Sequence, residues 1–474
     1  MSSLLRRVRD IQFRRAWLTP LVAVVVLWLA RRYGRYPSLY FLLQLLMLGG
    51  GLVLLQYPAL GPYAVVVAAL VVRMSFGTGT EVALNAATLL VPVAFGVWMI
   101  GELVRQQLHF VSSRVNRPLI LFVLAGFLSL AVGLVFWDPI VLRPSNILYV
   151  MLGQWAIFAV AGLAILLGAN VIRDETMLRR LVFVFLVVAG GLATLRLLPG
   201  LTGVIDNIST MALYRAPFWM LLTALAGGQL LYNPKLSSPW RLFLLAVLGA
   251  VLVYVLREQQ DAASNWVGVA VVGAVLAWFR FRRLRWFVVV ILLVLLVSGI
   301  LTEALWSFAG GEAEWEESGG SRLTLIGRVV SVTMRNPITG LGPGAYRAYA
   351  AMQPLAYGKA YWIRPAVNSH NNYVDLFAHT GALGLGLFLW LMIELGGLAL
   401  HLRRGVEDGF LSGFIHAMLA AWAGALVIMA LADWMLPHVY NIGFPGFQAA
   451  IPVWLFLGGL VAIEGMQRQR REAT

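Results

Sequence analysis

The sequence predicts an all-α polytopic membrane protein with twelve to fourteen transmembrane helices and one long extracytoplasmic loop before the last three spans. Hydrophobic residues make up 60% of its 474 residues and charged residues only 12%, with a mean hydropathy of +0.82. Uncharged runs such as Phe287 to Ile300 are typical of helices that cross lipid. A membrane β-barrel would show short alternating segments instead of continuous apolar runs of about twenty residues.

The chain carries a formal net charge of +15, which in a soluble protein would suggest nucleic acid as a partner. Here the basic residues form short clusters between apolar runs, as expected for loops retained on the cytoplasmic side. We therefore expect membrane lipids and no nucleic acid as partners. The chain has no cysteine, which excludes disulfides and thiolate chemistry.

The apolar runs place fourteen spans along the chain. They lie near residues 17–30, 39–56, 59–73, 83–103, 118–137, 147–171, 181–198, 211–231, 241–256, 265–279, 286–305, 371–400, 410–435 and 449–465. The number falls to twelve if 17–30 lies on the membrane surface and 39–73 is one bent span. With both termini in the cytoplasm, six basic clusters fall inside, and only Arg31, Arg32 and Arg35 disagree in the fourteen-span version.

This orientation divides the chain into a scaffold (1–305), an extracytoplasmic catalytic loop (306–370) and a C-terminal part with the last helices and a cytoplasmic tail (371–474). Within the loop, Glu312 to Gly320 is acidic and glycine-rich, which is typical of a solvated linker. Leu323 to Met334 has apolar residues at helical spacing and predicts an amphipathic helix on the membrane surface.

Arginines on the outer side run against the usual charge bias, so each of them needs a reason. Guanidinium groups bind phosphate oxygens as a two-pronged donor, which makes a lipid-linked phosphate or diphosphate the natural ligand of such a cluster. The alternative is that these side chains extend to headgroups or water. The candidates are Arg322, Arg328, Arg335, Arg347 and Arg364 in the loop, with Arg196 and Arg215 at the ends of earlier spans.

His370 opens a predicted span beside these arginines and is flanked by amide side chains. Nearby cations favour the neutral imidazole, which can accept a proton from a hydroxyl group at neutral pH. Asn371, Asp375 and His379 follow at a spacing of four, on one helical face, so Asp375 is placed to orient a partner. The alternatives are a capping role for His370 and a buried hydrogen-bonding role for His379.

Other polar residues carry weaker signals. Asp433 and His438 lie at an outer span end and could line the same site, although an interfacial aromatic belt explains Trp434 and Tyr440 equally well. His416 falls near the cytoplasmic end and is interpreted as structural. No histidine stands near the glutamates of 312–317, so the sequence predicts no metal and no cofactor.

Taken together, the loop motifs resemble the core of the O-antigen ligase and O-antigen polymerase superfamily. The motifs are Arg322, the turn Asn336 to Gly344, the run His370-Asn371-Asn372-Tyr373 and the stretch Gly381-Ala382-Leu383-Gly384-Leu385. They cover about seventy residues. The resemblance implies a metal-independent glycosyltransferase of the bacterial inner membrane, active in cell-envelope and lipopolysaccharide biosynthesis. Its donor would be a glycan on undecaprenyl diphosphate, and its acceptor the hydroxyl of a glycan or of lipid A core.

Carried over residue by residue, the resemblance assigns the essential histidine to His370 and the loop arginine to Arg322. A second arginine would be Arg215 or Arg196. Two positions depart from the pattern: Ser264-Asn265 stands where many relatives have a Ser-Arg pair, and His379-Thr380-Gly381 where many have an acidic residue before the glycine. The predicted catalytic set is therefore His370, Arg322, Asn371 and Asp375, and the predicted diphosphate-binding set is Arg215, Arg196, Arg322, Arg328 and Arg347.

Other functions stay open at this point. Within the same superfamily, a polymerase of repeat units or a protein O-oligosaccharyltransferase differs from a ligase mainly in the acceptor. A transporter or flippase for an anionic lipid-linked sugar belongs to a different class, in which polar groups gather near the membrane midplane of repeated halves. In this sequence the polar groups collect at one face, which favours the enzyme.

Overall fold

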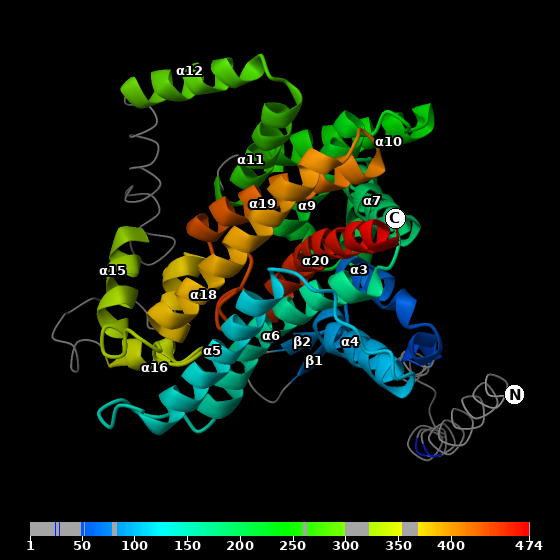
Figure 1. The fold of residues 1–474 in the computed structure, drawn as a ribbon. Helices are drawn as coiled ribbons and strands as arrows, with labels where there is room; N and C mark the ends of the chain where they lie inside the picture. The colour runs from blue at the N-terminus through cyan, green and yellow to red at the C-terminus, as the bar shows by residue number, and fades with distance from the viewer. Residues whose placement is uncertain are drawn as a thin grey trace, which may run out of the picture. The chain divides into compact units, whose positions relative to one another are not determined.

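The computed structural model describes residues 24, 28, 49–51, 53–77, 83–258, 263–298, 322–352 and 368–473. The chain divides into two compact units, Met1–Pro58 and Ala59–Thr474, and the second holds almost all of the described residues. Most residues of the predicted spans at 17–30 and 39–56 lie outside the described residues, as do Arg364 and the acidic linker. The predicted all-α polytopic class is confirmed (Figure 1).

Among its described residues, the second unit contains one short antiparallel hairpin among helices. The hairpin pairs β1 (Ser75–Gly77) with β2 (Ala83–Asn85). The first helices are α3 (Gly61–Val71), α4 (Ala86–Val104), α5 (Asn116–Val135), α6 (Ile147–Val171), α7 (Glu175–Leu195), α8 (Thr202–Ile208) and α9 (Ala216–Tyr232). The others are α10 (Ser238–Val253), α11 (Ala263–Arg280), α12 (Leu284–Val297), α15 (Arg322–Thr333), α16 (Tyr346–Ala351), α18 (Asn372–Leu402), α19 (Phe410–Leu431) and α20 (Gly443–Ala473).

Every predicted span from 59–73 onward overlaps one of these helices, and residues 299–305 of the span predicted at 286–305 lie outside the described residues. The span predicted at 147–171 matches α6 residue for residue. By length and composition, eight helices among the described residues can cross a membrane, or nine if residues 49–71 form one bent span. The predicted count of twelve to fourteen includes the spans at 17–30 and 39–56, most of whose residues are not described. Among the described residues, α3, α9 and α12 have only 11, 17 and 14 residues, and the apolar part of α11 is shorter than a full span. A helix needs about twenty residues to cross the hydrocarbon layer.

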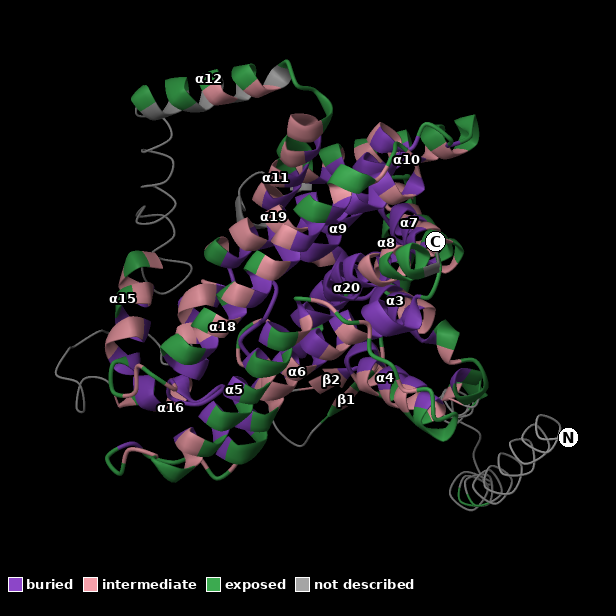
Figure 2. Cartoon of the chain, viewed as in Figure 1, coloured by how far each residue is buried: buried purple, intermediate pink, exposed green. Residues whose placement is uncertain are grey.

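Helix α20 is the centre of the described bundle, since its most apolar window is 100% buried. It packs against α3, α4, α6, α9, α18 and α19, and Figure 2 shows buried residues concentrated along α20, α9 and α19. Helices α6 and α20 cross closely at Gly168 and Gly458, where a side chain on either glycine would overlap the other helix's backbone. Small residues at such a crossing let two membrane helices make extensive van der Waals contact.

Helix α18 is broken at Gly381, which has φ 63° and ψ −168°. Residues 336–344 form a turn, called the docked turn from here on. This turn supplies the hydrogen bonds that the break removes. The amide of Leu341 donates to Ala378 O (2.9 Å), and the amides of Ala382 and Leu383 donate to Pro337 O (2.8 Å) and Ile338 O (3.1 Å). Since unsatisfied backbone groups in an apolar environment cost several kcal/mol, the break and the docked turn depend on each other.

Gly381→Ala is expected to destabilise the protein by at least about 2 kcal/mol, because alanine resists a positive φ and its methyl group would overlap Ile338 O. Gly386→Ala is the matched control, since Gly386 lies on an open face of the same helix. The apparent Tm of the purified variants in detergent checks this. Equal Tm values for Gly381→Ala and the parent would contradict the account of the break.

Candidate active site

His370 lies directly before α18 in a left-handed backbone conformation, with φ 51°. A residue other than glycine adopts this conformation only where its surroundings impose it. Here Asp375, one turn into α18, accepts hydrogen bonds from the Asn368 amide side chain (2.8 Å) and the Ser369 hydroxyl (2.6 Å). Asp375 therefore closes the 368–375 segment into a loop and fixes the backbone that carries His370.

Asn371 and Asn372 attach this segment to its surroundings. The Asn371 side chain caps α18 by accepting from the amides of Tyr373 (3.0 Å) and Val374 (3.3 Å), and it donates to Ala430 O at the end of α19 (3.0 Å). Asn372 is buried and donates to Leu436 O (2.8 Å). The sequence predicts a catalytic role for Asn371, whereas in the structure Asn371 makes the contacts of a helix cap.

The connection between α19 and α20, residues 432–442, forms the wall beside His370. Asp433 is fully buried there and accepts hydrogen bonds from the amide of His438 (2.9 Å) and the side chain of Asn441 (2.8 Å). Gln154 of α6 supports the same segment by donating to Pro437 O (3.0 Å) and accepting from the amide of Val439 (2.7 Å). Both α6 and α18 therefore hold this wall in place.

Asp433 lies within electrostatic range of both His370 and Arg215. Burial raises the pKa of Asp433, whereas the hydrogen bond from His438 and the nearby His370 act in the opposite direction. For Arg215, burial lowers the pKa of the guanidinium group, and the nearby Asp433 raises it. The guanidinium carbon of Arg215 lies 5.5 Å from the centroid of the Trp434 ring. A carboxylate between an imidazole and a desolvated guanidinium can orient the first and balance the charge of the second.

Two buried histidines stack beneath the docked turn. The rings of His379 and His438 lie 5.1 Å apart and nearly parallel. His379 Nδ1 accepts from the amide of Gly344 (3.2 Å), which leaves the proton of its neutral ring on Nε2. Burial, together with nearby Arg347, lowers the pKa of His438 to about 4, so this ring is neutral at neutral pH.

Buried polar atoms without a hydrogen-bond partner among the described residues gather at this end of the helices. Such atoms are suited to a hydroxyl-rich or anionic ligand, because the ligand can complete their hydrogen bonds. They are Arg215 Nε, Asn368 Oδ1, His379 Nε2, Trp434 Nε1 and both ring nitrogens of His438.

The predicted amphipathic helix at Leu323 to Met334 is confirmed as α15, which brings two predicted arginines to this end. Arg322 donates through Nη1 to the carbonyl of Leu431, two residues before Asp433. Arg328 is buried and donates to the hydroxyl of Tyr346 (2.8 Å), a residue whose pKa burial raises to about 12. Arg328 therefore has a firm structural role in joining α15 to α16.

The other predicted arginines lie in different environments. Arg347 is placed over the ring of Tyr440, with its guanidinium carbon 4.5 Å from the ring centroid. Arg335 pairs with Asp138 (3.3 Å). Arg196 pairs with Asp206 (2.9 Å) beside Tyr214, so a carboxylate already holds it.

Asn368, Ser369 and Asn372 are not among the predicted catalytic and binding residues, and Asp433 and His438 carry only a weak signal in the sequence. The density of small polar residues in 368–372 was an available signal, because such runs form hydrogen-bonded caps and turns. His416, interpreted as structural, stacks on Tyr232 (3.9 Å between centroids) and bonds to Ser412 O (2.9 Å) at the opposite end of α19.

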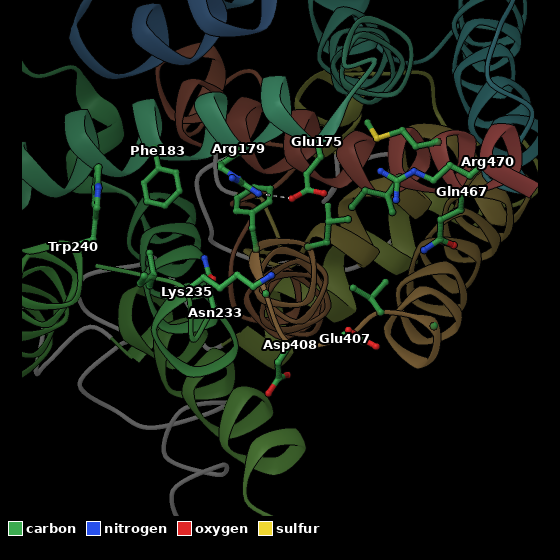
Figure 3. A pocket seen from close by; sticks show the side chains of 18 of the residues that line it. Glu175, Arg179, Phe183, Asn233, Lys235, Trp240, Glu407, Asp408, Gln467 and Arg470 are labelled. Atoms are coloured by element: carbon green, nitrogen blue, oxygen red, sulfur yellow. Dashed lines mark hydrogen bonds and ion pairs between the residues drawn. The ribbon is translucent and has the colours of Figure 1, made fainter. Parts of the chain in front are cut away.

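The pocket of about 740 Å³ in Figure 3 contains none of these residues. It lies at the opposite ends of α19 and α20, among residues 175–240, 405–411 and 463–471.

Residues 260–389 match the O-Antigen ligase family. This region, about a quarter of the chain, contains the docked turn, Arg322 and His370. No curated protein matches the chain. The family match confirms the resemblance that the motifs indicated and supports a glycosyltransferase of the O-antigen ligase or polymerase type in general.

Asp375→Ala is expected to loosen the His370 segment and to destabilise the protein by about 1–3 kcal/mol, since Asn368 and Ser369 lose a buried acceptor. Asp375→Asn is the matched control. The Asn368 amide can turn over and accept from the new amide through its unpartnered Oδ1, so most of the stability should remain. Apparent Tm measurements check the pair, and equal losses in both variants would contradict the anchoring role of Asp375.

Proposed function

Residues 260–389 carry the domain of the O-antigen ligase superfamily, and from this premise we propose that the protein transfers a glycan from undecaprenyl diphosphate to an acceptor hydroxyl. The observation that carries the proposal is the placement of His370. It lies in a constrained loop within electrostatic range of buried Asp433. Arg215 and Arg347 lie over aromatic rings of the wall, and Arg322 donates to Leu431 directly before it.

In the proposed reaction, His370 accepts the proton of the acceptor hydroxyl as its oxygen attacks the anomeric carbon. The new carbon–oxygen bond forms while the bond to the diphosphate breaks, and the leaving diphosphate takes the electron pair. Attack from the face opposite the leaving group inverts the anomeric configuration. Diphosphate is a good leaving group, so this step needs stabilisation of negative charge more than it needs an acid.

The arginines have different parts in this proposal. Arg322, Arg215 and Arg347 would bind the diphosphate, because guanidinium groups form paired hydrogen bonds with phosphate oxygens. Arg328 and Arg196 are better explained as structural, since Tyr346 and Asp206 respectively hold their side chains. Asp433 would orient His370 and stabilise its protonated form, whereas Asp375 acts on the loop that carries His370.

A ligase that uses lipid A core as its acceptor fits the family match most directly, and the superfamily's polymerases and protein glycosyltransferases differ in the acceptor. We further propose that the enzyme lies in the bacterial inner membrane with both termini in the cytoplasm and His370 outside, as the clusters of basic residues indicate. A flippase is less well supported, because the polar groups named above gather at one end of the helices.

His370→Gln is expected to lower turnover by about 10²–10⁴-fold, because glutamine can keep a hydrogen bond but cannot accept the proton. Donor binding should persist, since the arginines remain. His401→Gln, at the exposed far end of the same helix, is the matched control. The assay uses purified protein, undecaprenyl diphosphate glycan and a panel of acceptors, with product mass as the readout. Near-normal turnover of His370→Gln would rule out the base role.

Arg322→Ala is expected to weaken donor binding by roughly ten- to a hundredfold, the value of one or two charge-assisted hydrogen bonds to phosphate. Arg322→Lys should restore binding only in part, because an ammonium group cannot make the paired contact. Arg143→Ala removes an exposed arginine between α5 and α6 and serves as the control. Donor titration of the purified variants measures the effect. Unchanged affinity in Arg322→Ala, with an unchanged Tm, would contradict the assignment.

A further inference from the structure

The wall of residues 432–442 is described in full and forms neither helix nor strand. Most of its residues are buried, so their backbone groups need hydrogen-bond partners from other parts of the chain. Trp454 of α20 donates to Met435 O (3.2 Å), and the Asn372 side chain accepts from the amides of Met435 (3.1 Å) and Leu436 (3.3 Å). Side chains of the surrounding helices therefore determine the shape of the wall.

Gln154 of α6 holds the second half of the wall with both ends of its amide group. This side chain is fully buried, its Nε2 atom donates to Pro437 O (3.0 Å), and its Oε1 atom accepts from the amide of Val439 (2.7 Å). The two bonds lie on either side of His438 in the chain. Because the amide group is planar and bound at both ends, it cannot turn without breaking one of these bonds.

A single peptide group connects Gln154 to Asp433. Pro437 O and the N–H group of His438 belong to the same planar peptide unit. The carbonyl accepts from Gln154, and the N–H group donates to Asp433 Oδ2 (2.9 Å). A hydrogen bond to the carbonyl polarises the unit and strengthens the N–H group as a donor. Gln154 therefore fixes both the direction and the strength of the hydrogen bond that Asp433 receives.

The start of α18 holds the first half of the wall. Asn371 donates to a carbonyl at the end of α19 (3.0 Å), shortly before Asp433 in the chain, and Asn372 donates to Leu436 O (2.8 Å), shortly after it. His370 directly precedes these two asparagines. The contacts beside His370 thus lie on both sides of Asp433, whereas Gln154 reaches Asp433 from a different helix.

The surroundings of Gln154 on α6 are apolar. Its helical neighbours Val150, Met151, Ile157 and Phe158 are all buried. An amide buried among such side chains costs free energy unless it is hydrogen-bonded, and an apolar residue of similar length would pack there as well. The amide of Gln154 therefore serves the backbone of the wall and not the packing of α6.

We infer that Gln154 is a positioning residue for the proposed transfer reaction, and that it holds Asp433 in the orientation that serves His370. This inference rests on the proposed function. The other charged or titratable groups within electrostatic range of Asp433 include Arg215 and Asp375. Replacing Gln154 changes the charge of neither.

A double-mutant cycle of Gln154→Met and Asp433→Asn tests the inference. Methionine is close to glutamine in length but forms neither hydrogen bond, and Asp433→Asn removes the charge that Gln154 positions. Each single variant should lower turnover by about 10–100-fold. With Asp433→Asn already present, Gln154→Met should lower turnover by less than about threefold more. Losses that multiply in the double variant overturn the inference, since Gln154 would then act independently of Asp433.

The titration of His370 gives a second readout that does not need activity. NMR of the histidine-labelled protein in detergent follows the imidazole groups, and the signal that disappears in His370→Gln identifies His370. An ionised Asp433 favours the protonated imidazole, so Gln154→Met and Asp433→Asn should both move this titration to lower pH. An unchanged titration of His370 in Gln154→Met overturns the inference.

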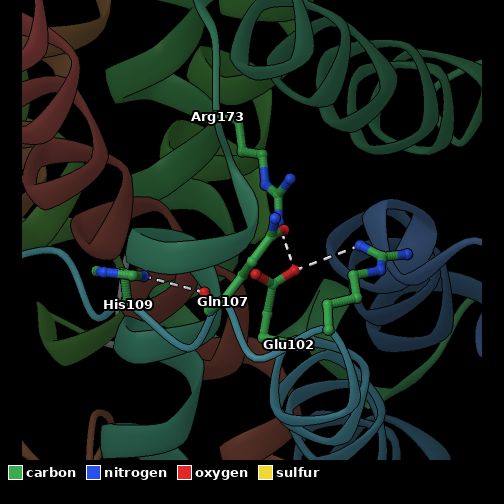
Figure 4. Close-up of polar contacts among 5 residues, drawn as sticks. Glu102, Gln107, His109 and Arg173 are labelled. Carbon is green, nitrogen blue, oxygen red and sulfur yellow. Dashed lines mark hydrogen bonds and ion pairs between the residues drawn. The ribbon is translucent and has the colours of Figure 1, made fainter. Parts of the chain in front are cut away.

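Glu102→Gln is the control for a loss of stability that does not involve the wall. Glu102 receives Arg173 (2.6 Å) and Arg105 (3.5 Å) beyond the other end of α6 (Figure 4). Roughly 26 Å of helix separates Gln154 from that end. This variant should lower the apparent Tm and leave turnover and the titration of His370 as in the parent. The same shift of the titration in Glu102→Gln would overturn the inference, because general destabilisation would then explain it.

Gln154→Asn provides a milder variant where Gln154→Met does not fold. Asparagine keeps the amide but is one methylene shorter, so it loses at least one of the two hydrogen bonds, and the same cycle and titration apply. A parent protein that transfers glycan to no acceptor contradicts the proposed function. The titration of His370 then decides by itself whether Gln154 positions Asp433.

Discussion

The docking of residues 336–344 onto the break in α18 is the interaction on which the described site depends. A membrane helix that loses its backbone hydrogen bonds at Gly381 needs replacements from outside, because lipid offers none. The docked turn supplies them through Leu341, Pro337 and Ile338. This docking fixes the position of Gly344, which holds His379, and of Arg347 shortly after it. The break therefore aligns the loop with the start of α18 while the rest of the helix continues across the bundle.

Asp375 and Asp433, the two buried carboxyl groups near His370, have different roles. Asp375 accepts hydrogen bonds from Asn368 and Ser369 and so holds the strained backbone that carries His370. Asp433 receives the amide of His438 and the side chain of Asn441, and it faces His370 and Arg215 electrostatically. Buried charges are retained only where partners compensate their desolvation. The partners that compensate Asp433 lie where the proposed reaction would transfer a proton and release the diphosphate.

The two ends of the bundle differ in chemistry although the same helices connect them. One end gathers His370, buried carboxylates and unpartnered polar atoms. The other gathers ion pairs and a pocket lined by charged side chains of both signs. Helix α20, buried along its whole apolar window, links both ends without exposing an apolar face of its own. Because such a core is closely packed, the loops at its two ends can differ in sequence and chemistry without changing how the helices pack.

The sequence by itself determined the class of the protein, the positions of most helices, α15 and the motifs around His370, because long apolar runs and cap residues act locally. It also predicted His370 at the start of a span, as observed. Only the tertiary structure decided which arginines have other partners, that Asp433 lies within electrostatic range of His370, and that α18 breaks at Gly381. Residues 433 and 370 are far apart in the chain, and their proximity depends on how α18, α19 and α20 pack. Helical periodicity places a residue on a face of its own helix, but only the packing of several helices sets its distance to a residue on another.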